Sequence, residues 1–319
     1  MQKETLYFKE ALEMWMDNNR ICLKQSTVTK YQNLINSHIL PELGLVKLSQ
    51  IDATLINTFL ASKLQNGRLS GNGGLSPAYV RSIMLIINAT IQFAVREQLM
   101  KPLKSQIHKP AILKKELEIL SIAEQKKMED YLSTDLNGTK MAILLSLHTG
   151  LRIGEICALA WEDIDLENQI IHVRHTVVRI NNQDPAENPI TKLILDSPKT
   201  KSSLRDVPIS SYLHPYLMNY FSYSNSKYVI SNSDTFMNPR TLEYRYHRIL
   251  DKCGITSVNF HVLRHTFASR CVAAGVDIKT LSEILGHGNV SITLNTYVHT
   301  SMEQKRTQLE KLTSYFSQN

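Results

Sequence analysis

Six residues in the second part of the sequence have side chains suited to chemistry at a phosphate group. They are Arg152, Lys199, His261, Arg264, His287 and Tyr297. A guanidinium donates two parallel hydrogen bonds to phosphate oxygens and stays charged at any working pH. Histidine and lysine transfer protons, and a tyrosine oxygen can act as a nucleophile. Together, these residue types would suit nucleophilic attack on a phosphate group.

Taken one at a time, these residues also have simple structural interpretations. Arg152 and Glu155, three residues apart, could form a surface ion pair worth under about 1 kcal/mol. Lys199, in SPKTKSS, could lie in a solvated hairpin turn. His287 follows the end of a predicted helix, where a histidine interacts favourably with the helix dipole. Only the combination of these residues therefore points to chemistry.

The motif HVLRH raises the question of a metal site. His261 and His265 are four residues apart, and two histidines at this spacing on a helix can chelate zinc. However, Val262 occupies the position of the general-base glutamate, and Arg264 would repel a cation. We therefore expect no metal, and we expect His261 and Arg264 to share one face of a helix.

The composition favours a polyanionic partner. The net charge is +7, and residues 1–110 contain 13 Lys and Arg against 7 Asp and Glu, whereas the remainder contains 23 against 22. The first third is thus the part suited to gripping a phosphate backbone. No apolar run approaches a bilayer span and no signal peptide is evident, so we expect a cytoplasmic protein. In a reducing cytosol the four separated cysteines should be small buried hydrophobic residues: Cys22, Cys157, Cys253 and Cys271.

The first part of the chain is expected to form a small helical bundle. Apolar residues at helical spacing predict helices over residues 5–20, 27–40, 53–65 and 78–98. Pro41 would end the second of them, because proline lacks the amide hydrogen. We assign this bundle to residues 1–105 and a linker rich in lysine and proline to residues 106–120.

Residues 121–319 are expected to form a second domain that mixes helices with a small antiparallel sheet. Ser121 and Glu124 have the spacing of a capping box, and MAILLSLHTG predicts a buried helix closed by Gly150. Three β-branched runs between residues 168 and 210 predict the sheet. Helices then return, including one capped by Asp277. The fold class is therefore mainly α, with a helical bundle and a mostly helical α/β domain.

The order and spacing of the six residues carry a family resemblance. Arg152 and Lys199 are separated by 46 residues, His287 lies 23 residues after Arg264, and Tyr297 follows ten residues later. The segments TGLRIGEICAL, PKTKSSLRDVPI, HVLRHTFAS and LGHGNVSITLNTYVH resemble the tyrosine recombinase (phage integrase) family across the whole second domain. STVTKYQNLINSHILPELG resembles the core-binding domain of that family. The resemblance implies that all six residues are catalytic and that Glu155 supports the first arginine.

The resemblance also implies a role for each group. The two arginines would hold the non-bridging oxygens in place of metal ions, and Lys199 would protonate the leaving 5′ oxygen. His261 would lie near the attack line of Tyr297 as a hydrogen-bonding or proton-accepting group, and His287 would donate to a non-bridging oxygen. The two histidine roles could be exchanged. No cofactor, metal or ATP is expected.

The partners implied by the resemblance are double-stranded DNA and further copies of the chain. We expect a monomer in solution, a homo-tetramer in the DNA synapse, accessory excision or bending proteins, and no membrane partner. The implied function is that of a site-specific integrase of a phage or conjugative element. The alternatives are a recombinase that resolves chromosome or plasmid dimers, a catalytically silent DNA-binding regulator, a type IB topoisomerase, and a metallohydrolase built on His261 and His265.

Two features at the ends of the chain leave alternatives open. The core-binding pattern starts near residue 1, so whether an arm-binding domain has been removed is undecided. At the other end, Ser301 and Gln304 have capping-box spacing, and the apolar stripe that follows predicts a C-terminal helix. This helix would dock either on its own domain or on a neighbouring protomer.

Overall fold

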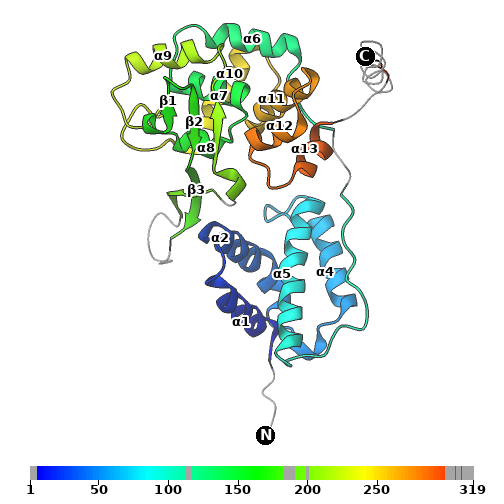
Figure 1. The fold of residues 1–319 in the computed structure, drawn as a ribbon. Coiled ribbons are helices and arrows are strands. Elements are labelled where there is room, and N and C mark those ends of the chain that lie inside the picture. The colour runs from blue at the N-terminus through cyan, green and yellow to red at the C-terminus, as the bar shows by residue number, and fades with distance from the viewer. Residues whose placement is uncertain are drawn as a thin grey trace, which may run out of the picture. The chain divides into compact units, whose positions relative to one another are not determined.

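The computed structural model describes residues 6–112, 116–182, 191–198, 201–298, 306 and 310. The chain divides into two compact units, coloured from blue to red along the sequence in Figure 1. The first unit comprises Met1–Lys115 with Ile180–Lys192, and the second comprises Glu116–Arg179 with Leu193–Asn319. The functional boundaries at residues 105 and 120 stay a prediction.

The first unit is a helical bundle. Its elements are α1 (Phe8–Arg20), α2 (Gln25–Leu34), α3 (Leu40–Leu43), a 3₁₀ turn (Leu48–Gln50), α4 (Ala53–Asn66) and α5 (Pro77–Arg96). Asp52 caps α4 by accepting a hydrogen bond from the amide of Leu55 at 2.8 Å. Ser76 caps α5 in the same way through the amide of Tyr79. Side-chain caps of this kind satisfy amides that the first helical turn leaves unpaired.

The prediction that Pro41 ends the second helix is wrong. A π-helical turn, Ile35–Ile39, joins α2 to α3, and Pro41 lies in the first turn of α3. Proline is tolerated there because a first-turn amide has no partner within its own helix. The continued helix places Ile39 and Leu43 in the core, where they are 0% and 2% exposed.

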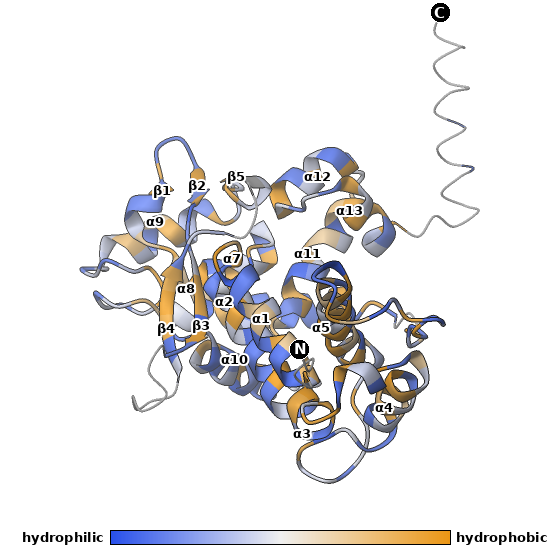
Figure 2. Cartoon of the chain, turned by 90° about the horizontal axis from the view of Figure 1, so that it is seen from below, coloured by the Kyte–Doolittle hydropathy of each residue, from blue (hydrophilic) through white to orange (hydrophobic). Residues whose placement is uncertain are grey.

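Helix α5 supplies much of the core of the first unit. Its residues Ile83, Ile86 and Ile87 are fully buried, and Figure 2 shows apolar residues along it. By length and composition α5 is apolar enough to cross a membrane. The expectation that no apolar run reaches that length is therefore wrong here. A core helix of a globular bundle meets the same criteria, since one face of it must be strongly apolar.

The first part of the predicted linker, residues 106–110, is hydrogen-bonded within the first unit. The side chain of Asn57 accepts from the amide of His108 at 2.8 Å and donates to the carbonyl of Gln106 at 3.4 Å. Nε of Arg81 donates to the carbonyl of Pro110 at 2.7 Å. These contacts fix residues 106–110 to helices α4 and α5.

The second unit contains most of the remaining helices. They are α6 (Ile122–Leu132), α7 (Gly138–Thr149), α8 (Ile153–Ala158), α9 (His214–Ser222), α10 (Pro239–Cys253), α11 (His261–Ala273), α12 (Ile278–Leu285) and α13 (Val290–Tyr297), with 3₁₀ turns Trp161–Asp163 and Lys201–Ser203. The predicted capping box is confirmed: Ser121 Oγ accepts from the amide of Glu124 at 3.1 Å, and the carboxylate accepts in return from the amide of Ser121 at 2.8 Å. Asp277 caps α12 as predicted.

The predicted antiparallel sheet is confirmed in the second unit. Strands β1 (Ile164–Asp165), β2 (Ile170–Val173) and β5 (Arg205–Pro208) pair in the order β1-β2-β5. Val173 stands opposite Arg205 in the β2–β5 register, so the sheet fixes the point at which Arg205 leaves the backbone. Strands β3 (Thr176–Asn181) and β4 (Thr191–Asp196) form a separate pair.

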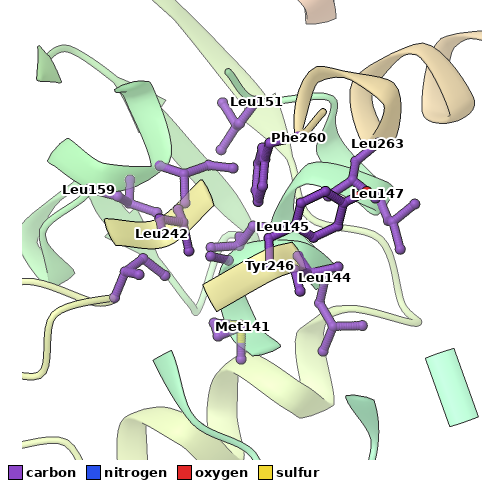
Figure 3. Close-up of a cluster of buried hydrophobic side chains, with 14 of the residues drawn as sticks. Met141, Leu144, Leu145, Leu147, Leu151, Leu159, Leu242, Tyr246, Phe260 and Leu263 are labelled. Atoms are coloured by element: carbon purple, nitrogen blue, oxygen red, sulfur yellow. The ribbon is translucent and has the colours of Figure 1, made fainter. Parts of the chain in front are cut away.

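A large apolar core holds these elements in place. Figure 3 shows part of it, with side chains from α7, α10 and α11 and from the loops between them. The labelled residues are Met141, Leu144, Leu145, Leu147, Leu151, Leu159, Leu242, Tyr246, Phe260 and Leu263. Because Leu263 is fully buried there, the residues next to it on α11 have a fixed position.

Two expectations concern residues outside this core. Cys157 and Cys253 are buried as predicted, and Cys271 is only partly buried. Cys22 is exposed just beyond the end of α1, so the expectation of burial is wrong for it. The C-terminal helix predicted after residue 300 lies largely outside the described residues.

Candidate active site

Arg152 and Glu155 meet at the start of α8. The backbone amide of Arg152 donates to Oε2 of Glu155 at 2.9 Å, and its Nη1 donates to Oε1 at 2.7 Å. Glu155 is only 5% exposed. Burial would raise its pKa, but the hydrogen bonds and charges of Arg205 and Arg152 outweigh burial and lower the pKa to about 2. The surface-ion-pair interpretation therefore does not apply to this buried carboxylate.

Arg205 supplies the second cation for Glu155. Its Nη1 and Nη2 donate to the two carboxylate oxygens at 3.1 and 2.9 Å, the bidentate geometry that makes such pairs strong. Arg205 is 8% exposed. Sequence reasoning missed this residue, although it lies within the quoted segment SLRDVPI, where alternation along β5 directs it inward.

Arg264 is completely enclosed, at 1% exposure. Its Nη1 donates to the carbonyl of Gly150 at 2.6 Å. Gly150 has a φ of +66°, and a Cβ there would lie 2.6 Å from Cδ1 of Phe267, so this turn requires glycine. Burial, together with the charge of Arg152, lowers the pKa of Arg264 to about 9. The guanidinium thus stays protonated at neutral pH.

The C-terminus of α12 is the common anchor of three guanidiniums. The last carbonyls of a helix lack intrahelical partners and form the negative end of its dipole. Three consecutive carbonyls of α12 each accept a hydrogen bond from a different arginine. The contacts are Arg205 Nε to Ile284 O at 2.6 Å, Arg264 Nη2 to Leu285 O at 2.7 Å, and Arg152 Nη2 to Gly286 O at 3.2 Å. This helix end therefore gathers the positive charge of the site.

His287 lies directly beyond this helix end. Its Nε2 is 3.0 Å from Nη2 of Arg264, and its Nδ1 is 2.8 Å from Oγ1 of Thr293. Because arginine can only donate, Nε2 accepts and Nδ1–H donates to the threonine. Burial and the charges of Arg264 and Arg152 lower the pKa of His287 to about 4. In this arrangement His287 holds Arg264, and donating through Nε2 to a phosphate would require it to gain a proton.

Tyr297 is the last residue of α13 and is 7% exposed. Its Oη lies 2.8 Å from Nδ1 of His265, and its ring is parallel to that of His287, with 6.4 Å between centroids. Burial raises the pKa of Tyr297, and the charges of Arg264 and Arg152 oppose this effect. The phenol is therefore protonated at neutral pH and needs an acceptor before it can attack.

The histidine that contacts Tyr297 differs from the expected one. His261 begins α11, and its ring lies edge-on to that of His265 with 4.5 Å between centroids. One turn later, His265 makes the hydrogen bond to Tyr297. The signal is present in HVLRH, since residues at i and i+4 share a helix face, but we considered that spacing only for zinc. Lys199 lies outside the described residues.

The described part of the chain has no group of three or more His, Cys, Asp or Glu side chains placed to hold a metal ion. Within it, Nδ1 of His265 is engaged by Tyr297.

Comparison with known proteins agrees with this geometry. The phage integrase family matches residues 113–304, and the N-terminal SAM-like domain of phage integrases matches residues 7–64. The chain is 30% identical to a tyrosine recombinase XerC-like protein of Caldanaerobacter subterraneus subsp. tengcongensis, over 93% of this chain and 80% of that one. It is 24% identical to the ICEBs1 integrase of Bacillus subtilis, over 91% of this chain and 79% of that one.

Solved structures share the fold. The Tn1549 transposon integrase, in complex with transposon right end DNA, has a TM-score of 0.77 at 20% identity, covering 97% of this chain and 100% of that one. A lambda integrase tetramer bound to a Holliday junction has a TM-score of 0.67 at 17% identity, covering 94% and 81%.

The fold and the matched domains define the class as that of the tyrosine recombinases, which are site-specific DNA recombinases. The chain belongs to the phage integrase family.

Proposed function

We propose that this chain cleaves and rejoins duplex DNA through a covalent bond between Tyr297 and a 3′ phosphate, and that it integrates or excises a mobile element. One observation carries the proposal. Two arginines, Arg152 and Arg264, converge with His287 and Tyr297 from four separate segments on the end of α12. Desolvating several cations at one place is costly, and an anionic substrate such as a phosphate would offset that cost.

The arginines stabilise the charge that develops on the non-bridging oxygens. Arg152 is the more accessible of the two, with a side chain 35% exposed, whereas Arg264 is fixed by backbone carbonyls. Donors that are already oriented need no reorganisation when the pentavalent phosphorus forms. Lys199 is the proposed general acid for the 5′ oxygen, and His261 and His287 complete the proposed set around the phosphate.

The proposed partner is duplex DNA, gripped by residues 1–105 as the core-binding domain and connected by a linker over residues 106–120. We infer a monomer in solution and four protomers in the synapse, with accessory proteins setting direction. The lambda integrase that shares this fold forms a tetramer on a Holliday junction, and it supports this assembly by analogy. Because the substrate is DNA, we infer a cytoplasmic location.

Both mobile-element integrases and a XerC-like protein are among the relatives. We favour integration and excision because conjugative and transposon integrases recur among the relatives. Recombination between two copies of one chromosomal site, without element ends, would favour dimer resolution instead.

The test is a nicked suicide duplex carrying the ends of the element that surrounds the coding sequence, incubated with the full chain in excess EDTA. The wild type should give a slowly migrating protein–DNA adduct on a denaturing gel, and Tyr297→Phe should give none while still binding the DNA. An adduct that persists in Tyr297→Phe, or cleavage that EDTA abolishes, would refute the proposal.

A further inference from the structure

The hydroxyl of Tyr297 and the ring of His265 form the contact on which the reactivity of the nucleophile depends. Oη lies 2.8 Å from Nδ1. Burial raises the pKa of Tyr297, and burial with the charge of Arg264 lowers the pKa of His265. Both groups are therefore neutral near pH 7. The phenol donates, Nδ1 accepts, and the ring hydrogen of His265 lies on Nε2.

We propose that His265 is the proton acceptor for Tyr297, an inference that rests on the function proposed above. As the bond between Oη and phosphorus forms and the bond to the 5′ oxygen breaks, the phenolic proton passes to Nδ1. Lys199, in its proposed role, supplies a proton to the 5′ oxygen. One cation is lost and one is gained, so the net charge of the site does not change. In rejoining, the 5′ hydroxyl attacks phosphorus and gives its proton back to Lys199, while His265 returns its proton to the departing Oη.

The other two histidines are less suited to this step. Both ring nitrogens of His287 are engaged, one by Arg264 and the other by Thr293. His261 contacts the ring of His265 edge-on. Among the three histidines, His265 is the one whose ring nitrogen accepts the hydrogen bond of the Tyr297 hydroxyl.

Helix α11 gives the acceptor a fixed position. His265 directly follows Arg264, whose guanidinium is held by the carbonyls of Gly150 and Leu285. A rigidly anchored arginine fixes the helix turn that also carries the acceptor. One turn of α11 thus fixes the positions of both Arg264 and the proposed proton acceptor, His265.

The timing follows from the relative acidities. The ordinary pKa of tyrosine is about 10 and that of histidine about 6.5, so little proton transfer occurs before attack. The O–H···N hydrogen bond leaves the lone pairs of Oη free to approach phosphorus. As the new O–P bond withdraws electron density from Oη, the phenolic proton becomes acidic enough to move to the imidazole.

Single-turnover cleavage of the nicked suicide duplex tests the inference. His265→Asn keeps an acceptor oxygen near the position of Nδ1 but cannot take up a proton, and His265→Ala removes both. His261→Asn is the matched control one turn earlier. Each variant is prepared with tyrosine and with 3,5-difluorotyrosine at position 297, because the fluorinated phenol loses its proton more readily. Thermal unfolding and DNA binding are measured for every protein.

We expect His265→Asn to cleave roughly 10²-fold more slowly than wild type, the usual contribution of a general base, with unchanged DNA binding. Difluorotyrosine at position 297 should raise the cleavage rate of His265→Asn and His265→Ala at least about tenfold. It should restore little in His261→Asn, where a different role is lost.

Three results would overturn the inference. If His265→Asn cleaves at the wild-type rate, His265 only positions the phenol. Faster cleavage by His265→Ala would identify the hydrogen bond as a lock on a resting nucleophile. Rescue by difluorotyrosine confined to His261→Asn would transfer the role to His261. Absence of any adduct with wild type would instead count against the proposed function itself.

Discussion

The two halves of the site are held in place by very different means. One half is the arginine clamp, formed by Arg152, Arg205 and Arg264 at the end of α12. In it, Arg205 and Arg264 are almost fully buried, and each donates to several fixed acceptors. On the nucleophile side, Tyr297 ends a short helix, α13, in which Val290, Ile292 and Leu294 are exposed. The arginines thus have several fixed partners each, whereas the side chain of Tyr297, the proposed nucleophile, contacts His265 through its hydroxyl and packs in a small apolar cluster. The arginines are therefore the more firmly held half of the site.

The largest expected effect comes from one substitution in each half of the site, and it tests the comparison directly. Arg264→Lys and Tyr297→Phe should both reduce cleavage by roughly 10³-fold or more, because a lost charge-stabilising donor costs 10²–10³ and a lost nucleophile costs more. Their stabilities should diverge. Arg264→Lys leaves buried carbonyls unpaired and should cost about 3 kcal/mol, whereas Tyr297→Phe loses one hydrogen bond and should cost about 1 kcal/mol.

Urea unfolding of the two variants measures this difference. Equal losses of stability would mean that the two halves are held with similar strength, and the comparison would fail.

The next effect concerns the buried ion pair. Glu155→Gln should lower the free energy of unfolding by about 3–5 kcal/mol, because it leaves Arg205 without its buried counter-ion. Arg205→Met should cost a similar amount, and the double variant should cost less than the sum. Cleavage should fall in all three variants because Arg152 loses its support. A strictly additive double variant would show that the two residues do not act as a pair.

The effect of pH is smaller and separates two windows. The folded protein holds His287 neutral, with its pKa lowered to about 4, while the unfolded chain takes up a proton near pH 6.5. The stability contributed by His287 is therefore full above pH 6.5 and is lost as pH falls towards 4, on the order of 2 kcal/mol. The pKa of Glu155 is lowered to about 2. The stability contributed by Glu155 is therefore full above the ordinary pKa of a glutamate and is lost only as the pH falls below it.

Thermal unfolding from pH 8 to 3 checks these windows. His287→Gln should reduce the loss of stability between pH 6.5 and 4 and leave the more acidic window unchanged. The loss that remains in the upper window includes that from His261 and His265, whose pKa values are also lowered. A flat wild-type profile in the upper window would contradict a neutral His287.

The smallest effect is a control for the rest. Ser121→Ala removes the cap of α6 and should cost about 1 kcal/mol of stability. Cleavage should not change, because Ser121 contributes nothing to the clamp or to Tyr297. A slower adduct in this variant would show that loss of stability alone lowers activity, and the rates of the other variants would then need correction.

Local patterns in the sequence were sufficient for most of the helices. Caps at Asp52, Ser76, Ser121 and Asp277 act within one turn, so the residues that form them are neighbours in the sequence. The failure at Pro41 has the same local character. The π-helical turn places Pro41 in the first turn of the next helix. Neither residue spacing nor composition predicts such a turn.

The site was predicted less completely because its contacts join distant segments. Arg205 reaches Glu155 across 50 residues, and His265 reaches Tyr297 across 32. Neither residue type is unusual at its place in the sequence, so only the folded arrangement distinguishes them. The family resemblance identified the groups expected to touch phosphate, but it did not identify the groups that hold those residues in position.

The three carbonyls at the end of α12 link the positions of the three arginines to one another. Successive residues of a helix are rotated by roughly 100° about its axis, so turning α12 by one residue would withdraw all three acceptors at once. Since α12 also packs against α13, a displacement of α13, which carries the proposed nucleophile, would be passed through α12 to Arg152 and Arg264.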